Sequence, residues 1–226
     1  MAVFDEELAQ LKGKLLKMGA LVESAIKDSV RALLDKSEEL AKQVLEREHE
    51  VNALDVEVDE MCFKLIALRQ PKAGDLRFIT TAMKITTDIE RMGDLAVNIA
   101  QRALELKKET ILAPFVDIPR MREIAQGMTR DALDSFVNKD KRLAMDVIMR
   151  DQKIDDLKHT ILGELLMLMT EAPERICWAM KISFVAQYLE RIADHATNVA
   201  EMVIYLAEGR IIRHMSVPTD VKEECR

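Results

Sequence analysis

The sequence predicts an all-α protein made of two tandem, elongated three-helix bundles related by an internal repeat. Three observations lead to this prediction. The 226 residues include only 7 Gly, 5 Pro and 4% aromatic residues, while 49% are hydrophobic and 32% charged, a composition typical of long helices with short connections. Helical periodicity continues almost from end to end. A motif on the third expected helix recurs on the sixth, which indicates two copies of one structural unit.

The expected helices occupy residues near 4–35, 38–69, 73–108, 119–137, 140–170 and 174–208. Each break between them contains a residue that caps or terminates helices. Ser37 is the expected N-cap of the second helix. Pro71 disfavours a helical Gln70 and so separates the second helix from the third, and Pro173 makes the corresponding break in the second half. Because the loops are short, neighbouring helices are expected to run antiparallel.

The boundary between the two units is expected where Pro114 and Pro119 interrupt the helical pattern. We therefore expect a first bundle at residues 1–112, a linker at 113–118, a second bundle at 119–213 and a tail at 214–226.

The repeated motif is an acidic stripe on the third helix of each half. Residues 89–100 read IERMGDLAVNIA and residues 189–200 read LERIADHATNVA. Residues four apart share one face of a helix, so two carboxylates and an amide line up at the border of each apolar face. The two stripes comprise Glu90, Asp94 and Asn98, and Glu190, Asp194 and Asn198. The repeat extends to the second helix of each half, at a spacing of 103 instead of 100 (40 to 143 and 54 to 157).

These stripes are candidate metal ligands. Like charges four apart weaken a helix by a few tenths of a kcal/mol, yet the chain places them there twice. Carboxylate and amide oxygens in a row suit a hard cation that offsets the repulsion. The six stripe residues are therefore predicted metal ligands, and Asp28 and Asp131, 103 apart on the first helices, are further candidates. No Cys or paired His lies near the stripes, so a closed tetrahedral zinc site is not expected.

Other interpretations of the acidic residues remain open. Each stripe is a surface ion-pair strip if Arg91 pairs with Asp94 and Arg191 with Asp194. If the acidic residues bind no metal, Asp28 and Asp131 are expected to be solvated acids.

Two histidines are weaker candidate ligands. Glu46-x-x-His49 resembles half of a ferritin-type di-iron ligand set, but the second half of the chain has no matching element in register. His195 adjoins the second motif, but its counterpart is Leu95, which favours a surface or ion-paired histidine over a ligand.

Charge and composition argue against several classes of protein. A net charge of -7 disfavours nucleic-acid binding and adsorption to anionic membranes. No apolar run reaches the roughly 18–20 residues that span a bilayer, and the N-terminus lacks a secretory pattern. The three cysteines are too widely spaced for a metal site or a disulfide framework, which favours a reduced cytoplasm. No nucleophile–base pair, phosphate loop or GxSxG motif occurs, so a binding or regulatory module is expected, not an enzyme.

In combination, these features resemble the PhoU family over residues 4–213. The resemblance rests on TDIERMGD at residues 87–94, YLERIADHATN at 188–198, AEMVIYLAEG at 200–209 and Arg69-Gln70-Pro71 followed by Asp75-Leu76-Arg77. It implies a cytoplasmic, commonly dimeric regulator that damps the phosphate-starvation response when phosphate is plentiful. The implied partners are the ATPase of the phosphate ABC transporter and a membrane sensor histidine kinase. No membrane insertion is implied.

The resemblance also implies multinuclear iron or zinc clusters, which some members of the family bind through an E/DxxxD motif on each third helix. This motif carries over to Glu90 and Asp94, and to Glu190 and Asp194. Two alternatives remain: a metal-storage or metal-sensing helical protein, and a carboxylate-bridged metalloenzyme.

Overall fold

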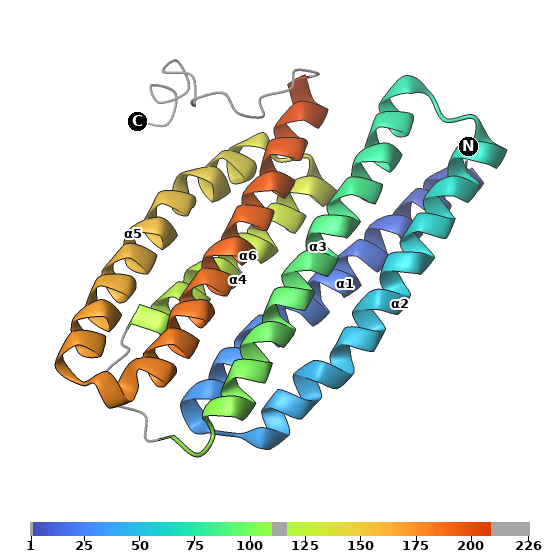
Figure 1. Ribbon diagram of the computed structural model, residues 1–226. Helices are drawn as coiled ribbons and strands as arrows, with labels where there is room; N and C mark the ends of the chain where they lie inside the picture. Colours follow the sequence, from blue (N-terminus) through green and yellow to red (C-terminus); the bar gives the residue numbers. More distant parts are fainter. Residues whose placement is uncertain (1, 110–116, 209–226) are drawn as a thin grey trace.

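A computed structural model describes residues 2–109 and 117–208, which contain helices and no strand (Figure 1). The elements are α1 (Ala2–Asp35), α2 (Glu38–Arg69), α3 (Ala73–Leu106), α4 (Asp117–Asn138), α5 (Lys141–Glu171), the short 3-10 helix η1 (Pro173–Arg175) and α6 (Ile176–Glu208). The predicted all-α fold with an internal repeat is confirmed. None of the described helices is both long and apolar enough to cross a membrane.

The repeat is visible in the turns that open the second helix of each half. Lys36 and Lys139 both adopt a left-handed conformation, with φ of 52° and 54°. The next residues, Ser37 and Asp140, are the N-caps of α2 and α5. Each side chain accepts a hydrogen bond from the backbone N–H three residues on, at 3.2 and 3.1 Å, which satisfies a donor that the helix leaves free. The predicted N-cap at Ser37 is confirmed.

The start of α4 differs from the prediction. The helix begins at Asp117, two residues early, so that Pro119 lies in the first turn. Proline is tolerated there because its missing N–H would have no helical partner. Residues 117 and 118 of the expected linker are therefore helical, whereas 113–116 and the expected tail lie outside the described residues.

The six α-helices of the described residues form two layers, and each layer contains helices from both halves. In Figure 1, α5, α6, α3 and α2 lie side by side in front, with α4 behind α6 and α1 behind α3. Contacts within each half join all three of its helices, and contacts between halves join α3 to α6 and α1 to α4. The buried apolar residues of both halves belong to one hydrophobic cluster. The two bundles are thus packed against each other along their length.

The contacts between the halves show how close this packing is. Glu105 near the end of α3 lies 3.5 Å from Lys181 near the start of α6, while Asp88 meets His195 further along, so α3 and α6 run antiparallel. The rings of Phe78 on α3 and Phe136 on α4 stack with centroids 4.7 Å apart. Both motifs therefore lie near the middle of the α3–α6 contact.

Candidate metal centre

Each acidic stripe faces the second helix of its own half. Glu90 on α3 interacts electrostatically with Asp94 on its own helix and with Asp55 and Glu48 on α2. We call these four residues the first acidic cluster. The arrangement follows from helix geometry, because Ile89 and Met92 are fully buried and place the carboxylates at the border between core and solvent.

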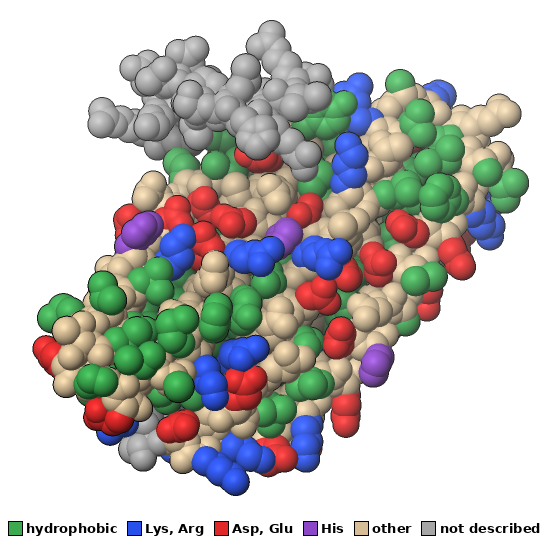
Figure 2. Space-filling view, in the orientation of Figure 1, with side chains coloured by type: hydrophobic (Ala, Val, Ile, Leu, Met, Phe, Trp, Pro, Cys, Tyr) green, Lys and Arg blue, Asp and Glu red, His purple; other side chains and the backbone are tan. Residues whose placement is uncertain are grey.

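The second acidic cluster is the equivalent group in the other half. It comprises Asp151 and Asp155 on α5 and Glu190 and Asp194 on α6, which repel one another. Unlike the first cluster, it contains an ammonium group. Lys158 on α5 donates hydrogen bonds to Glu190 (2.7 Å) and Asp155 (3.3 Å). Figure 2 shows acidic side chains gathered over α5 and α6 on the left of the view.

Both clusters hold carboxyl groups whose pKa is raised. In the first cluster, desolvation and then repulsion by Asp94 raise the pKa of Glu90. In the second, desolvation of the carboxyl group, followed by repulsion from Glu190 and Asp151, raises the pKa of Asp194 to about 6, although the residue as a whole is exposed. Desolvation also raises the pKa of Asp151, ahead of repulsion by Asp155. Crowded carboxylates of this kind favour a bound cation or a proton.

Among residues 2–109 and 117–208, no three His, Cys, Asp or Glu side chains converge closely enough to hold a metal ion as they stand. The candidate ligands nevertheless all offer oxygen atoms, which suit a hard cation. Glu90 and Asp94 are also partly buried and lie close to other acids. Metal binding at these residues therefore stays a prediction.

The amides and the histidine near the stripes have other contacts. Asn198 donates a long hydrogen bond to Asp88 across the α3–α6 contact (3.4 Å). The same carboxylate oxygen lies 2.8 Å from Nδ1 of His195, so His195 has a carboxylate partner, as the sequence favoured. Asn98, the equivalent amide on α3, is half-buried.

The further candidates Asp28 and Asp131 lie in equivalent ion pairs. Asp28 binds Arg47 at 3.0 Å, and Asp131 binds Arg150 at 2.6 Å. All four side chains are mostly buried, and each pair joins the first helix of a half to the second. This contact supplies a structural role for both acids, as a link between helices.

The ion-pair strip that the sequence left open forms on one side only. Arg91 lies 3.2 Å from Asp94 and 3.4 Å from Glu90. Arg191 is exposed and makes no ion pair with a described residue. Glu46 and His49 are both exposed on α2, a position that does not suit a di-iron site inside a bundle.

Sequence reasoning did not identify the acids contributed by α2 and α5. A signal was present, because Glu48 and Asp151 are related by the repeat spacing of 103. Without the packing, nothing distinguished these acids from the many solvated acids on the same helices.

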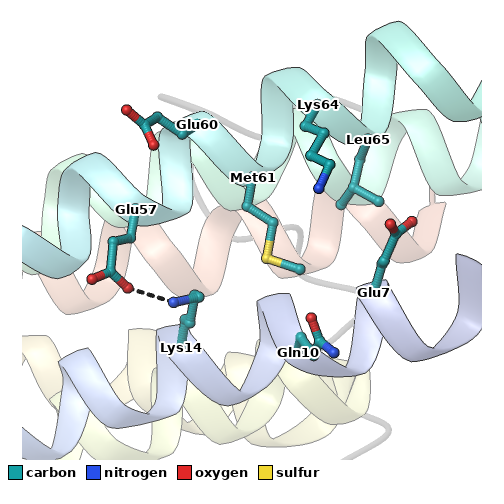
Figure 3. Close-up of a pocket in the computed structure, with 8 residues that line it drawn as sticks. All are labelled: Glu7, Gln10, Lys14, Glu57, Glu60, Met61, Lys64 and Leu65. Atoms are coloured by element: carbon teal, nitrogen blue, oxygen red, sulfur yellow. Dashed lines mark hydrogen bonds and ion pairs between the residues drawn. The ribbon is translucent and has the colours of Figure 1, made fainter.

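A separate pocket of about 340 Å³ lies between α1 and α2 (Figure 3). It is lined by Glu7, Gln10, Lys14, Glu57, Glu60, Met61, Lys64 and Leu65. Lys14 forms an ion pair with Glu57 across it, and Glu7 is held by Arg69 on α2. These charges neutralise each other, and no motif residue faces the pocket.

Comparison with known proteins agrees with the fold and the repeat. The PhoU domain model matches residues 15–103 and again residues 118–203. A protein of Aquifex aeolicus, described as a phosphate-specific transport system accessory protein PhoU homolog, is 44% identical over 94% of this chain and 96% of its own length. The homolog of Pseudomonas aeruginosa is 40% identical over 98% and 91%.

Two solved structures are also similar. The crystal structure of PhoU from Pseudomonas aeruginosa superposes with a TM-score of 0.88 at 39% identity, covering 92% of this chain and 100% of that one. The phosphate transport system regulatory protein PhoU from Streptococcus pneumoniae superposes with a TM-score of 0.85 at 29% identity, covering 92% and 98%. Because both repeats match the domain model and the relatives are matched over almost their whole length, the chain belongs to the PhoU family.

Proposed function

We propose that this protein is a cytoplasmic negative regulator of phosphate uptake and of the Pho regulon. The observation that carries the proposal is the match of the PhoU domain to both repeats. The relatives' description as accessory proteins of a phosphate-specific transport system supports it. The protein acts by binding other proteins, and no substrate turnover is proposed.

The proposed mechanism is that of an adaptor. The chain contacts the ATPase of the phosphate ABC transporter and the sensor histidine kinase. In this way it signals the activity state of the transporter to the kinase. A rigid pair of bundles with a shared core suits this role, because it presents long helical faces to more than one partner. A homodimer is part of the proposal, as the resemblance implies.

The acidic clusters are the proposed metal-binding part of this regulator. Glu90 and Asp94, and Glu190 and Asp194, would hold iron, zinc or another divalent cation, with the facing acids of α2 and α5 as additional ligands. The cation would neutralise crowded carboxylates and tie the second helix of each half to the third, which stabilises the faces that partners contact.

The first test is a phosphate-repressible reporter in a strain that lacks this protein. We expect the deletion to switch the reporter on at high phosphate and the wild-type gene to silence it. A variant with Glu90→Gln, Asp94→Asn, Glu190→Gln and Asp194→Asn keeps the side-chain shapes and removes the ligands' charge. If metal is needed for regulation, this variant leaves the reporter on.

The matched control replaces four exposed acids outside the clusters: Glu46→Gln, Glu50→Gln, Glu164→Gln and Glu174→Gln. It changes net charge equally and should still silence the reporter. A reporter that stays off in the deletion strain contradicts the proposed function.

Metal storage or sensing is the second candidate function, and the two carboxylate clusters are the observation that favours it. It predicts that the deletion changes the cell's response to metal supply and leaves phosphate control intact. The reporter therefore separates the two candidates.

A further inference from the structure

Exposed apolar side chains form a band where α5 ends and α6 begins. Five of them are between 38% and 66% exposed, and they follow one another every four residues along each helix, which places them on one side of it. Figure 2 shows hydrophobic side chains gathered over this part of α5 and α6, at the lower left of the view. We call these five residues the α5–α6 patch: Leu162 and Leu166 on α5, and Ile176, Met180 and Phe184 on α6.

The first half of the chain shows that the fold does not require this patch. The repeat spacings of 103 and 100 assign an equivalent position to each patch residue. Three of these positions are polar or charged in the first half, and two are apolar in both halves. The pairs are Leu162 and Asp59, Met180 and Thr80, Phe184 and Lys84, Leu166 and Phe63, and Ile176 and Leu76. A contiguous exposed apolar surface that the fold does not need marks an interaction site.

The register of this comparison is fixed by the core. Residues that adjoin the patch and their equivalents in the first half are all buried. The buried pairs are Val58 and Ile161, Cys62 and Leu165, Ala82 and Ile182, and Ile85 and Val185. The patch residues and their equivalents therefore occupy the same places on the two repeats.

The second acidic cluster continues the same side of both helices. Asp155 precedes Leu162 by seven residues, and Asp194 follows Met180 by fourteen. Both spacings return close to the same side of a helix. At 1.5 Å per residue they correspond to about 10 and 21 Å along the helices. The surface of α5 and α6 is thus apolar near the turn that joins them and acidic further along.

This surface complements an amphipathic helix that is apolar at one end and basic at the other. The four carboxylates of the cluster stand against two cations, Lys158 and the exposed Arg191, so negative charge is in excess. Apolar residues at helical spacing are the usual anchors of a helix that docks on a protein surface, and Lys or Arg beyond them would meet the acids. A second copy of this chain fits less well, because both of its repeats carry acids beside this position.

We propose that the α5–α6 patch and the second acidic cluster together form a docking surface for an amphipathic, basic helix of a partner protein. Apolar side chains of the partner helix cover the patch, and its Lys or Arg side chains lie over the acids. This inference rests on the adaptor role in the proposed function. It goes further, because it assigns one face of this chain and states the chemistry of the segment that binds there.

The test uses a fluorescein-labelled synthetic helix of about 18 residues, with Leu at helical spacing in one half and Lys at the same spacing in the other. Its binding to the full-length, chelator-treated protein is followed by fluorescence anisotropy. A second peptide has Glu in place of every Lys. We expect the Lys peptide to bind and the Glu peptide to bind at least about tenfold more weakly, because acids then meet acids. Equal binding of the two peptides would overturn the basic character of the partner.

A triple variant gives the patch the residues of the first half: Leu162→Asp, Met180→Thr and Phe184→Lys. The first repeat carries these residues at the equivalent places, and the net charge is unchanged. The variant should bind the Lys peptide at least about tenfold more weakly, an effect typical of lost anchor residues. Thermal melts show whether it is folded. Leu166→Gln, at the most exposed patch residue, is the second variant if it is not.

The matched control makes the same kinds of change at exposed apolar residues of the first half: Leu68→Asp, Val56→Thr and Leu76→Lys. It should bind the Lys peptide as the wild type does. Equal binding by the wild type, the control and the patch variants would overturn the docking surface.

Two other occupants of the patch would also overturn the proposal. A second copy occupies it if the peptide does not bind the wild type and light scattering shows that the triple variant, unlike the control, turns a dimer into a monomer. The chain's own C-terminal segment occupies it if Ile211→Asp with Ile212→Asp lets the peptide bind where the wild type does not.

The phosphate reporter separates this inference from the proposed function. We expect the triple variant to leave the reporter on at high phosphate and the control to silence it. If the folded triple variant silences the reporter as the wild type does, this inference is overturned and the regulator stands. A reporter that stays off in the deletion strain overturns the regulator, whereas peptide binding still decides the docking surface.

Discussion

At the scale of single residues, the motif carboxylates lie where burial and like charges act together. The carboxylate of Asp194 faces Glu190 on its own helix, and Asp151, Asp155 and Lys158 on α5. Desolvation, together with the weaker repulsion by these carboxylates, outweighs the attraction of Lys158, so the pKa of Asp194 is raised from 3.8 to about 6. Ionisation of Asp194 is therefore less favourable in the folded, metal-free protein than in the unfolded chain.

The pH dependence of stability follows from this pKa. The folded protein binds the Asp194 proton more tightly than the unfolded chain does. The stabilisation that protonated Asp194 contributes is therefore fully present below about pH 3.8 and is lost as pH rises through 6. Asp194→Asn mimics the protonated form. In chelator-treated protein at pH 7 it should increase the free energy of unfolding by about 1 kcal/mol or less, since solvent screens a partly exposed group.

Thermal denaturation between pH 4 and pH 7 measures this effect. The difference between Asp194→Asn and wild type should disappear near pH 4. Asp156→Asn, at an exposed position of α5, is the control for the loss of one negative charge. A variant less stable than wild type at pH 7 would show that the charged carboxylate is instead stabilising.

At the scale of helices, small residues decide how closely the elements approach. A Cβ built on Gly19 of α1 would lie 2.1 Å from Cδ1 of Leu133 on α4. Leu133 is buried, with 3% of its surface exposed, so it has little room to move. Gly93, at the centre of the first motif, has more room for a side chain. A Cβ there would meet Val22 and Val51 at 3.5 Å, an ordinary van der Waals distance.

Two glycines of α1 should therefore respond oppositely to alanine. Gly19→Ala should destabilise the protein by about 1–3 kcal/mol, the usual cost of overpacking a core. At Gly13 a Cβ would meet nothing within 4 Å, so Gly13→Ala should stabilise by about 0.5–1 kcal/mol through helix propensity. Urea denaturation of the two variants provides the comparison. If Gly19→Ala were as stable as Gly13→Ala, the close approach of α1 to α4 would be in doubt.

At the scale of the whole molecule, the repeats form one cooperative structure. The Phe78–Phe136 stack, the α3–α6 contact and the single hydrophobic cluster join the two halves. The interface also carries specific polar contacts, such as the pair between Asp88 and His195. Neither half has its core complete without the other.

We therefore expect a single unfolding transition for the full chain. In scanning calorimetry of metal-free protein, the calorimetric enthalpy should equal the van't Hoff enthalpy. Two resolved transitions would mean that the bundles unfold independently, as separate domains on a linker do.

The local features of this molecule could be predicted from the sequence. Helix lengths, the N-cap at Ser37 and the repeat depend on periodicity and on neighbouring residues, and the structure agrees with them. The shift of the α4 start to Asp117 arose because a proline in a first turn does not end a helix. The border position of Glu90 and Asp94 also followed from periodicity alone.

The partners across helices were decided only by the tertiary structure. Periodicity states which face of a helix is apolar, but not which residue of a neighbouring helix meets its border. Packing therefore decided that Glu48 and Asp55 face the first motif, that Lys158 enters the second cluster, and that the two halves share one core. The sequence by itself determined the helices, the repeat and the family, because these are carried by local pattern. The difference between the two acidic clusters required the structure, because it depends on distances between helices.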